Sequence, residues 1–117
     1  MARVGSLKRR NNMAQGDLTK EIEYDKIEVV STWNIQVRKA TKVMEEQADG
    51  SKKELTRSFH RHVLQPFNSQ KGSDGKWTHT ATDISGEDAS VQAIANAAWT
   101  DDVKTAYKTF RESQTTP

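Results

Sequence analysis

Residues 22–66 read IEYDKIEVVSTWNIQVRKATKVMEEQADGSKKELTRSFHRHVLQP, and this stretch decides the fold. Apolar and charged side chains alternate through most of it, which is the period-2 pattern of half-buried β-strands. Asp49-Gly50 marks a tight turn, because glycine supplies the positive φ that a hairpin needs. Pro66 ends the last strand, because proline cannot donate to the ladder. The pattern predicts three consecutive strands.

The alternation also assigns faces to the strands. Along the middle strand, one face carries Trp33, Ile35, Val37, Thr41 and Val43, and the other carries Gln36, Arg38, Ala40 and Lys42. The third strand, from about Lys53 to Leu64, carries Leu55, Phe59 and Val63 on one face. In the first strand the phase slips at Asp25-Lys26, which predicts either two short strands or one bulged strand.

The C-terminal third is predicted to be helical after a long polar loop at residues 67–83. Ser85 is the expected N-cap of the first helix, with Asp88 three residues on, and Thr100 is the expected N-cap of the second. The apolar stripes are Val91, Ile94, Ala95 and Ala98 in the first helix, and Val103, Ala106, Tyr107 and Phe110 in the second.

Together these segments predict an α+β fold, a three- to four-stranded antiparallel β-meander followed by two short C-terminal α-helices. Residues 1–17 are interpreted as a flexible basic N-terminal arm, residues 18–112 as a single domain, and residues 113–117 as a C-terminal tail. We expect the sheet faces that carry Trp33, Ile35, Val37 and Leu55, Phe59, Val63 to meet the two helix stripes.

The basic character of the chain belongs to its first residues. Residues 1–12 hold Arg3, Lys8, Arg9 and Arg10 and no acid; without them the formal net charge of +2 becomes 14 basic against 16 acidic residues, or −2. Such an arm is a candidate for binding nucleic acid through counterion release. The alternatives are a solvated tail, or a true start at Met13 with the preceding run not native.

Few residue patterns in this chain suggest chemistry. The chain has no cysteine, which excludes disulfides, thiolate metal sites and a cysteine nucleophile. His60 and His62 share a strand face, so two imidazoles with His79 as a third ligand would be a metal site; solvated or interface histidines are the simpler interpretation. The sequence predicts no catalytic residue, no metal, no cofactor and no membrane partner, and therefore a protein that is not an enzyme.

Binding to other macromolecules is the better-supported class of function. Arg57, Phe59 and Arg61 alternate on one strand face, a composition typical of interfaces and of RNA-binding strands, although Phe59 is equally interpreted as core. Ile22 and Tyr24 face one way and Ile27 and Val29 the other, so a second chain is expected at residues 22–30. The candidate interaction residues are Lys8, Arg9, Arg10, Ile22, Tyr24, Arg57, Phe59, Arg61 and Trp77.

Four segments resemble a group of small proteins encoded by tailed bacteriophages, including phages of marine bacteria. They are DKIEVV (25–30), WNIQVRKATKVMEE (33–46), LTRSFHRHVLQP (55–66) and ISGEDASVQAIANAAWTDDVKTAY (84–107). The resemblance implies a phage origin and carries over no catalytic residue. It implies a virion component that binds a larger capsid, neck or tail protein, or copies of itself. The alternative is a small factor in the host cytoplasm that binds a host protein or nucleic acid during infection.

Overall fold

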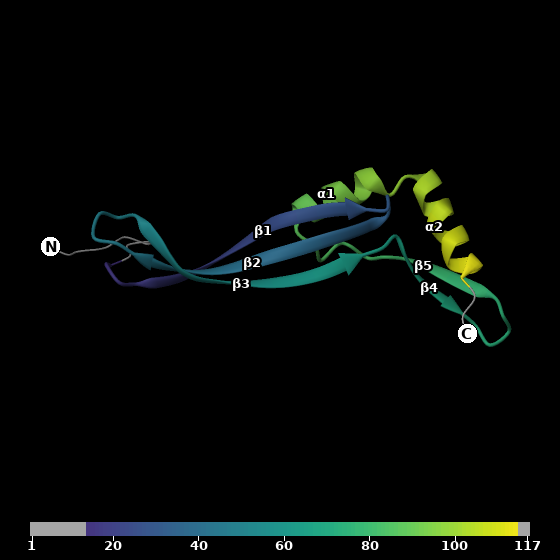
Figure 1. Cartoon of the computed structure of the whole chain (residues 1–117), viewed down its shortest axis with the longest axis horizontal. Coiled ribbons are helices and arrows are strands. Elements are labelled where there is room, and N and C mark those ends of the chain that lie inside the picture. Colours follow the sequence, from purple (N-terminus) through teal and green to yellow (C-terminus); the bar gives the residue numbers. More distant parts are fainter. Residues whose placement is uncertain (1–13, 115–117) are drawn as a thin grey trace. The chain divides into compact units, whose positions relative to one another are not determined.

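The computed structural model describes residues 14–114 and has the α+β fold that the sequence predicts (Figure 1). Its elements are β1 (Leu18–Val30), β2 (Asn34–Glu46), β3 (Lys52–Leu64), β4 (Phe67–Lys71), β5 (Trp77–Ala81), α1 (Ala89–Ala98) and α2 (Asp101–Ser113). β1, β2 and β3 form a three-stranded antiparallel sheet in chain order, and β4 and β5 form a second sheet. The predicted arm residues Lys8, Arg9 and Arg10 lie outside the described residues. No helix within residues 14–114 is long and apolar enough to cross a bilayer.

Two turns connect the strands of the larger sheet. The β2–β3 turn has the predicted glycine, since Gly50 has a φ of +87° and its N–H donates to the carbonyl of Gln47. The β1–β2 turn instead places Ser31 and Thr32 at φ values of +57° and +66°. β1 remains one strand through Asp25-Lys26. Tyr24 and Ile27 both pack against the same core although they are three residues apart, which fits a single slip of the alternation between them.

The described chain divides into two compact units. The strand unit joins the described residues up to Glu23 with Lys39–Phe59, and the helical unit joins Tyr24–Arg38 with the described residues from His60 onward. The single domain expected over residues 18–112 stays a prediction, and each unit is described separately below.

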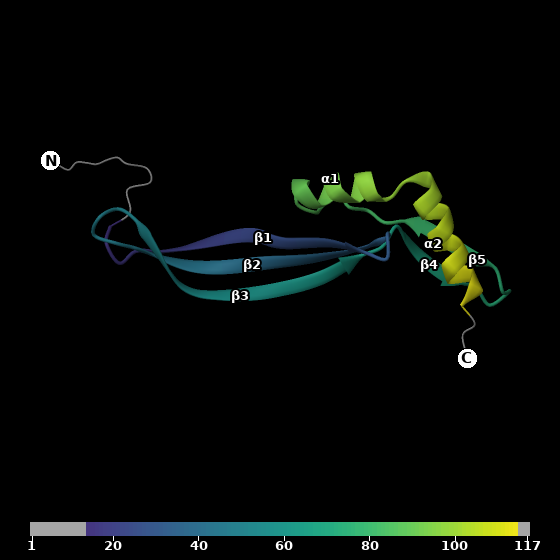
Figure 2. The same ribbon diagram turned by 45° about the horizontal axis from the view of Figure 1, so that its top comes forward.

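The core of the helical unit forms where α1 packs on β1 and β2, as Figures 1 and 2 show. Its buried side chains are Ile35, Val37, Val91, Ala95 and Trp99, with Trp33, Ile94 and Val103 packed against them. Tyr107 of α2 is also buried, and its ring meets that of Trp33 edge-on at 5.5 Å. The predicted contact between the Trp33, Ile35, Val37 face and the helix stripes is confirmed.

The same expectation is wrong for β3. Leu55, Phe59 and Val63 are 46%, 44% and 55% exposed. Leu55 and Phe59 belong to the strand unit, which contains neither helix. Val63 is exposed because its neighbour Leu64 packs against the core, and adjacent strand residues point to opposite faces.

The loop predicted at residues 67–83 is a hairpin. β4 and β5 pair antiparallel from Phe67 opposite Ala81 to Lys71 opposite Trp77. The turn is closed by the Gly72 N–H, which donates to the Lys76 carbonyl at 2.7 Å, and Gly75 has a φ of +82°. Figures 1 and 2 both place this hairpin beside α2.

The two helices begin at side-chain caps. The Thr100 hydroxyl accepts from the Val103 N–H at 3.2 Å, as predicted. α1 begins at Ala89, and its cap is Asp88, which accepts from the Ser90 N–H; the prediction of Ser85 as the cap is wrong. The hydrogen bonds from the Ser90 hydroxyl and N–H lower the pKa of Asp88.

Candidate interaction surface

His62 and His79 take part in hydrogen bonds with other side chains. His60 and His62 lie on β3 with ring centroids 6.0 Å apart, and His62 Nε2 lies 2.9 Å from a carboxylate oxygen of Glu87. His79 lies on β5 and has different partners. Within residues 14–114, no group of three or more histidine, aspartate or glutamate side chains is arranged to hold a metal ion.

Ser69, His79 and Glu112 form a chain of hydrogen bonds within the helical unit. Ser69 Oγ lies 2.7 Å from His79 Nδ1, and His79 Nε2 lies 2.7 Å from Glu112 Oε2. A nucleophilic triad uses the same residue types but also needs oxyanion donors beside the serine. None of these three residues lines the cavity described below. The imidazole is 9% exposed, so we assign it the structural role of joining β5 to α2.

Trp77 is docked within the helical unit. Its ring stacks on that of His79 at 6.0 Å with an interplanar angle of 4°, and the Arg111 guanidinium lies 5.7 Å from its ring centroid. A cation over a tryptophan face contributes about 0.5–2 kcal/mol. Trp77 therefore helps to hold α2 against the β4–β5 hairpin, and its predicted role as an anchor for a partner has less support.

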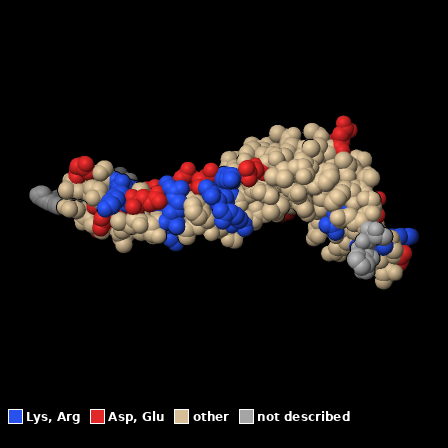
Figure 3. Space-filling model, in the orientation of Figure 1, with Lys and Arg blue, Asp and Glu red and all other residues tan. Residues whose placement is uncertain are grey.

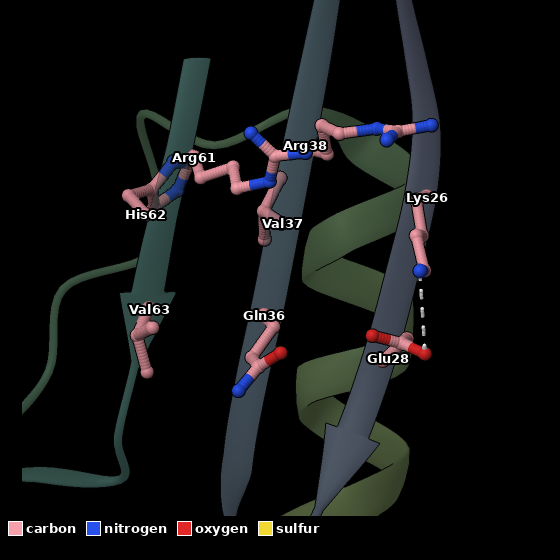
Figure 4. A pocket seen from close by; sticks show the side chains of 8 residues that line it. All are labelled: Lys26, Glu28, Gln36, Val37, Arg38, Arg61, His62 and Val63. Carbon is pink, nitrogen blue, oxygen red and sulfur yellow. Dashed lines mark ion pairs between the residues drawn. The ribbon is translucent and has the colours of Figure 1, made fainter. Parts of the chain in front are cut away.

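A cavity of about 330 Å³ opens on the helical unit (Figure 4). Its lining residues are Lys26, Glu28, Gln36, Val37, Arg38, Arg61, His62 and Val63. In Figure 4, Arg61 extends from β3 toward β2, and Arg38 extends from β2 toward β1. Cavities that bind drug-sized ligands range from about 300 to 1,000 Å³, so this one is at the small end.

The cations of this cavity are close to carboxylates. Arg38 donates two hydrogen bonds, of 3.0 and 2.8 Å, to the two carboxylate oxygens of Asp25. Lys26 lies 3.9 Å from Glu28 in an exposed ion pair. The pairing of Arg38 and Lys26 weakens the case for an anion site here.

In the strand unit, the sheet has a different chemistry on each side. Glu46 pairs with Asp17, and Gln47 pairs with Ser51, through backbone hydrogen bonds of 2.9 and 2.8 Å. Counting by twos from these pairs gives one side of the sheet four exposed apolar side chains. They are Leu18, Ile22, Leu55 and Phe59, exposed by 59%, 55%, 46% and 44%, and we call them the apolar strand patch.

The opposite side of the strand unit carries ion pairs. Lys42 lies 3.0 Å from Glu23, and Lys52 lies 3.4 Å from Glu21. Figure 3 shows lysine and arginine interleaved with aspartate and glutamate along the sheet. By the same count the patch side also holds Lys20, Lys53 and Arg57, but large apolar side chains exposed on a sheet normally pack against another layer. Both helices belong to the helical unit, so no helix of the strand unit supplies that layer.

Arg57 and Glu54 lie beside the patch on β3. The guanidinium donates two hydrogen bonds, of 3.0 and 2.8 Å, to the carboxylate. These bonds lower the pKa of Glu54, with a smaller electrostatic contribution from Lys42. The pair keeps charge next to the apolar side chains, which is the composition of an interface core with a polar rim.

The candidate residues are divided between the two units. Ile22, Arg57 and Phe59 lie in the strand unit, whereas Tyr24, Arg61 and Trp77 lie in the helical unit. Tyr24 packs against the helical core, so it is a structural residue as well as a candidate contact. The sequence reasoning missed Leu18, although its spacing of four from Ile22 repeats the spacing of Leu55 and Phe59 and would have identified the patch.

No protein-family model, curated protein or solved structure matches this chain. The resemblance to phage proteins and the function it implies therefore stay predictions.

Proposed function

We propose that this chain is a non-enzymatic component of a phage particle that binds a larger capsid, neck or tail protein through the apolar strand patch. The observation that carries the proposal is the two-sided sheet of the strand unit. One side carries two ion pairs, and the other exposes Leu18, Ile22, Leu55 and Phe59, which alternate with Lys20, Lys53 and Arg57. The phage particle itself enters the proposal through the sequence resemblance.

The exposed apolar side chains are large enough to contribute to binding. Fully burying a leucine, isoleucine or phenylalanine side chain contributes about 1.5–3 kcal/mol, and each patch residue is already about half-buried. Roughly half of that value remains for each of the four residues. Large exposed apolar side chains beside charged ones are a common composition for a protein-binding surface.

Particle composition tests the first half of the proposal. We expect mass spectrometry to detect the chain in purified, extensively washed virions at a stoichiometry that repeats between preparations. If the chain is abundant in infected cells and absent from washed particles, the intracellular factor is the better function.

Substitutions test the second half. Leu55→Ser and Phe59→Ser should each weaken binding of the purified chain to particles from which the native chain is missing by about tenfold or more, because each removes apolar area at the contact. Val63→Ser is the matched control, since Val63 lies on the same strand, is 55% exposed and belongs to the helical unit. Equal binding by all three variants would exclude the patch as the docking surface.

A further inference from the structure

Both edges of the three-stranded sheet are long and unpaired within the described chain. β2 lies between β1 and β3, and each of these outer strands has 13 residues and no proline. An edge strand presents a row of backbone donors and acceptors that can pair with another chain. Natural proteins usually protect such edges with short strands, prolines, β-bulges or charged side chains, lysine above all. In β1 and β3 the protection comes from charged side chains.

The two edges carry charges of opposite sign. In the strand unit, the β1 segment has Lys20, Glu21 and Glu23, a net charge of −1. The β3 segment has Lys52, Lys53, Glu54 and Arg57, a net charge of +2. The whole strands have the same signs, with four acids and two bases in β1, and one acid and four bases in β3.

We propose that copies of this chain assemble head-to-tail, with β3 of one copy pairing with β1 of the next. The charges favour this arrangement, because two edges with net charge of the same sign repel each other and two edges with net charge of opposite sign attract each other. Cross-strand pairs of opposite charge contribute about 0.2–1 kcal/mol each, and like charges in the same positions are destabilising. Lys53 thus opposes pairing between two β3 edges and favours an acidic β1 edge, whereas Lys52 is already paired with Glu21 within the chain.

The direction of the strands and the apolar strand patch agree with this pairing. β1 and β3 run in the same direction, because each is antiparallel to β2, so a repeated copy adds a parallel strand pair. Leu18 and Ile22 lie on the same side of the sheet as Leu55 and Phe59, and pairing therefore brings apolar side chains of neighbouring copies together.

A head-to-tail contact uses different surfaces on the two partners, so every added copy leaves one edge of each kind unpaired. Repetition gives a closed ring if the rotation that relates neighbouring copies adds up to a full turn, and an open filament if it does not. Self-assembly of this kind stands apart from the proposed function, because it needs no larger protein. The patch would then be presented many times on one assembly.

Two edge-blocking variants test the proposal by complementation. Along an edge strand, successive N–H groups point alternately toward β2 and toward the open edge. Counted from the Glu46–Asp17 and Gln47–Ser51 pairs, the N–H groups of Lys20 and Thr56 point to the open edges of β1 and β3. Proline there removes the outward donor and leaves the pairing with β2 intact. We expect light scattering after size exclusion to give a mass above one chain for the parent, rising with concentration, and the mass of one chain for Lys20→Pro or Thr56→Pro alone.

An equimolar mixture of the two variants should give two chains and nothing larger, because each supplies the edge that the other lacks. A parent that stays at one chain at high concentration would overturn the proposal, as would either variant dimerising alone or a mixture that stays at one chain. If circular dichroism shows that a proline variant is unfolded, Lys53→Glu replaces the series. That variant should weaken self-association by about tenfold at low salt, and unchanged association would overturn the proposal equally.

Discussion

The indole N–H of Trp99 donates a hydrogen bond of 2.8 Å to the backbone carbonyl of Trp33. Trp99 is the C-cap of α1 and is 8% exposed, while Trp33 is the last residue of the turn between β1 and β2. One bond therefore joins the end of a helix to a hairpin that lies 66 residues earlier in the chain.

Trp99→Phe should destabilise the helical unit. The phenyl ring keeps most of the apolar contact but lacks the donor, so the partly buried Trp33 carbonyl loses its partner, at a cost of about 1–3 kcal/mol. Urea unfolding followed by circular dichroism measures the change. Trp77→Phe is the control, because Trp77 is held by ring stacking and its indole N–H makes no hydrogen bond within the described residues. A larger loss of unfolding free energy in Trp77→Phe than in Trp99→Phe would contradict the stabilising role of the Trp99 hydrogen bond.

Thr32→Gly should stabilise the chain. Thr32 has a φ of +66°, and a left-handed conformation costs a residue with a Cβ about 1–2 kcal/mol. Glycine removes that strain but loses more backbone entropy on folding, so the expected net gain is about 0.5–1 kcal/mol. Thr105→Gly provides the contrast, because Thr105 lies within α2 and glycine lowers helix stability there. If both changes destabilise, the turn at Thr32 is not strained.

A double-mutant cycle on Asp25 and Arg38 should give a coupling free energy of about 1–3 kcal/mol, as expected for hydrogen bonds between charged groups. Two donors of one guanidinium bind both oxygens of a carboxylate whose side chain is 9% exposed. The same cycle on Lys26 and Glu28 should give about 0–1 kcal/mol, because that pair is 3.9 Å apart and exposed. Equal couplings in the two cycles would show that burial at Asp25 contributes little.

A repeated local signal explains both a success and a failure of the sequence reasoning. Asp49-Gly50 predicts its hairpin correctly, and Asp74-Gly75 makes a turn of the same form. In each turn the aspartate side chain accepts from the backbone N–H two residues later, and the glycine has a φ above +80°. The second hairpin was interpreted as a loop because its strands are short and polar, so their alternation is weaker than that of β2.

The candidate site was harder to predict, because exposure depends on what covers a strand. Alternation correctly places Ile35 and Val37 on a buried face and Leu55 and Phe59 on an apolar face. It does not say which of these faces another layer covers. Tyr24 shows the converse: its position beside Ile22 favours a surface contact, whereas a slip in β1 brings it to the helical core. Tyr24→Asp is therefore expected to destabilise the helical unit, which makes it unsuitable for testing assembly.

Stability should fall at acidic pH partly through the cap of α1. Hydrogen bonds from the Ser90 hydroxyl and N–H lower the pKa of Asp88 in the folded chain, and the carboxyl of an unfolded aspartate has a pKa of about 3.9. The unfolded state thus binds more protons below that pH. The stabilisation is complete above about pH 4 and is lost as the pH falls through the lower, folded pKa. Asp49 and Asp83 have lowered pKa values for the same reason, since a serine two residues later donates to each.

Asp88→Asn isolates this contribution, because asparagine is also a good N-cap but does not titrate. The urea midpoint of the variant should change less than that of the parent between pH 5 and pH 2, while the two differ little at pH 7. Asp74→Asn is the control: Asp74 accepts from a backbone N–H in a turn rather than at a helix start. Identical acid profiles for the parent and Asp88→Asn would show that protonation of the cap does not contribute to the loss of stability at low pH.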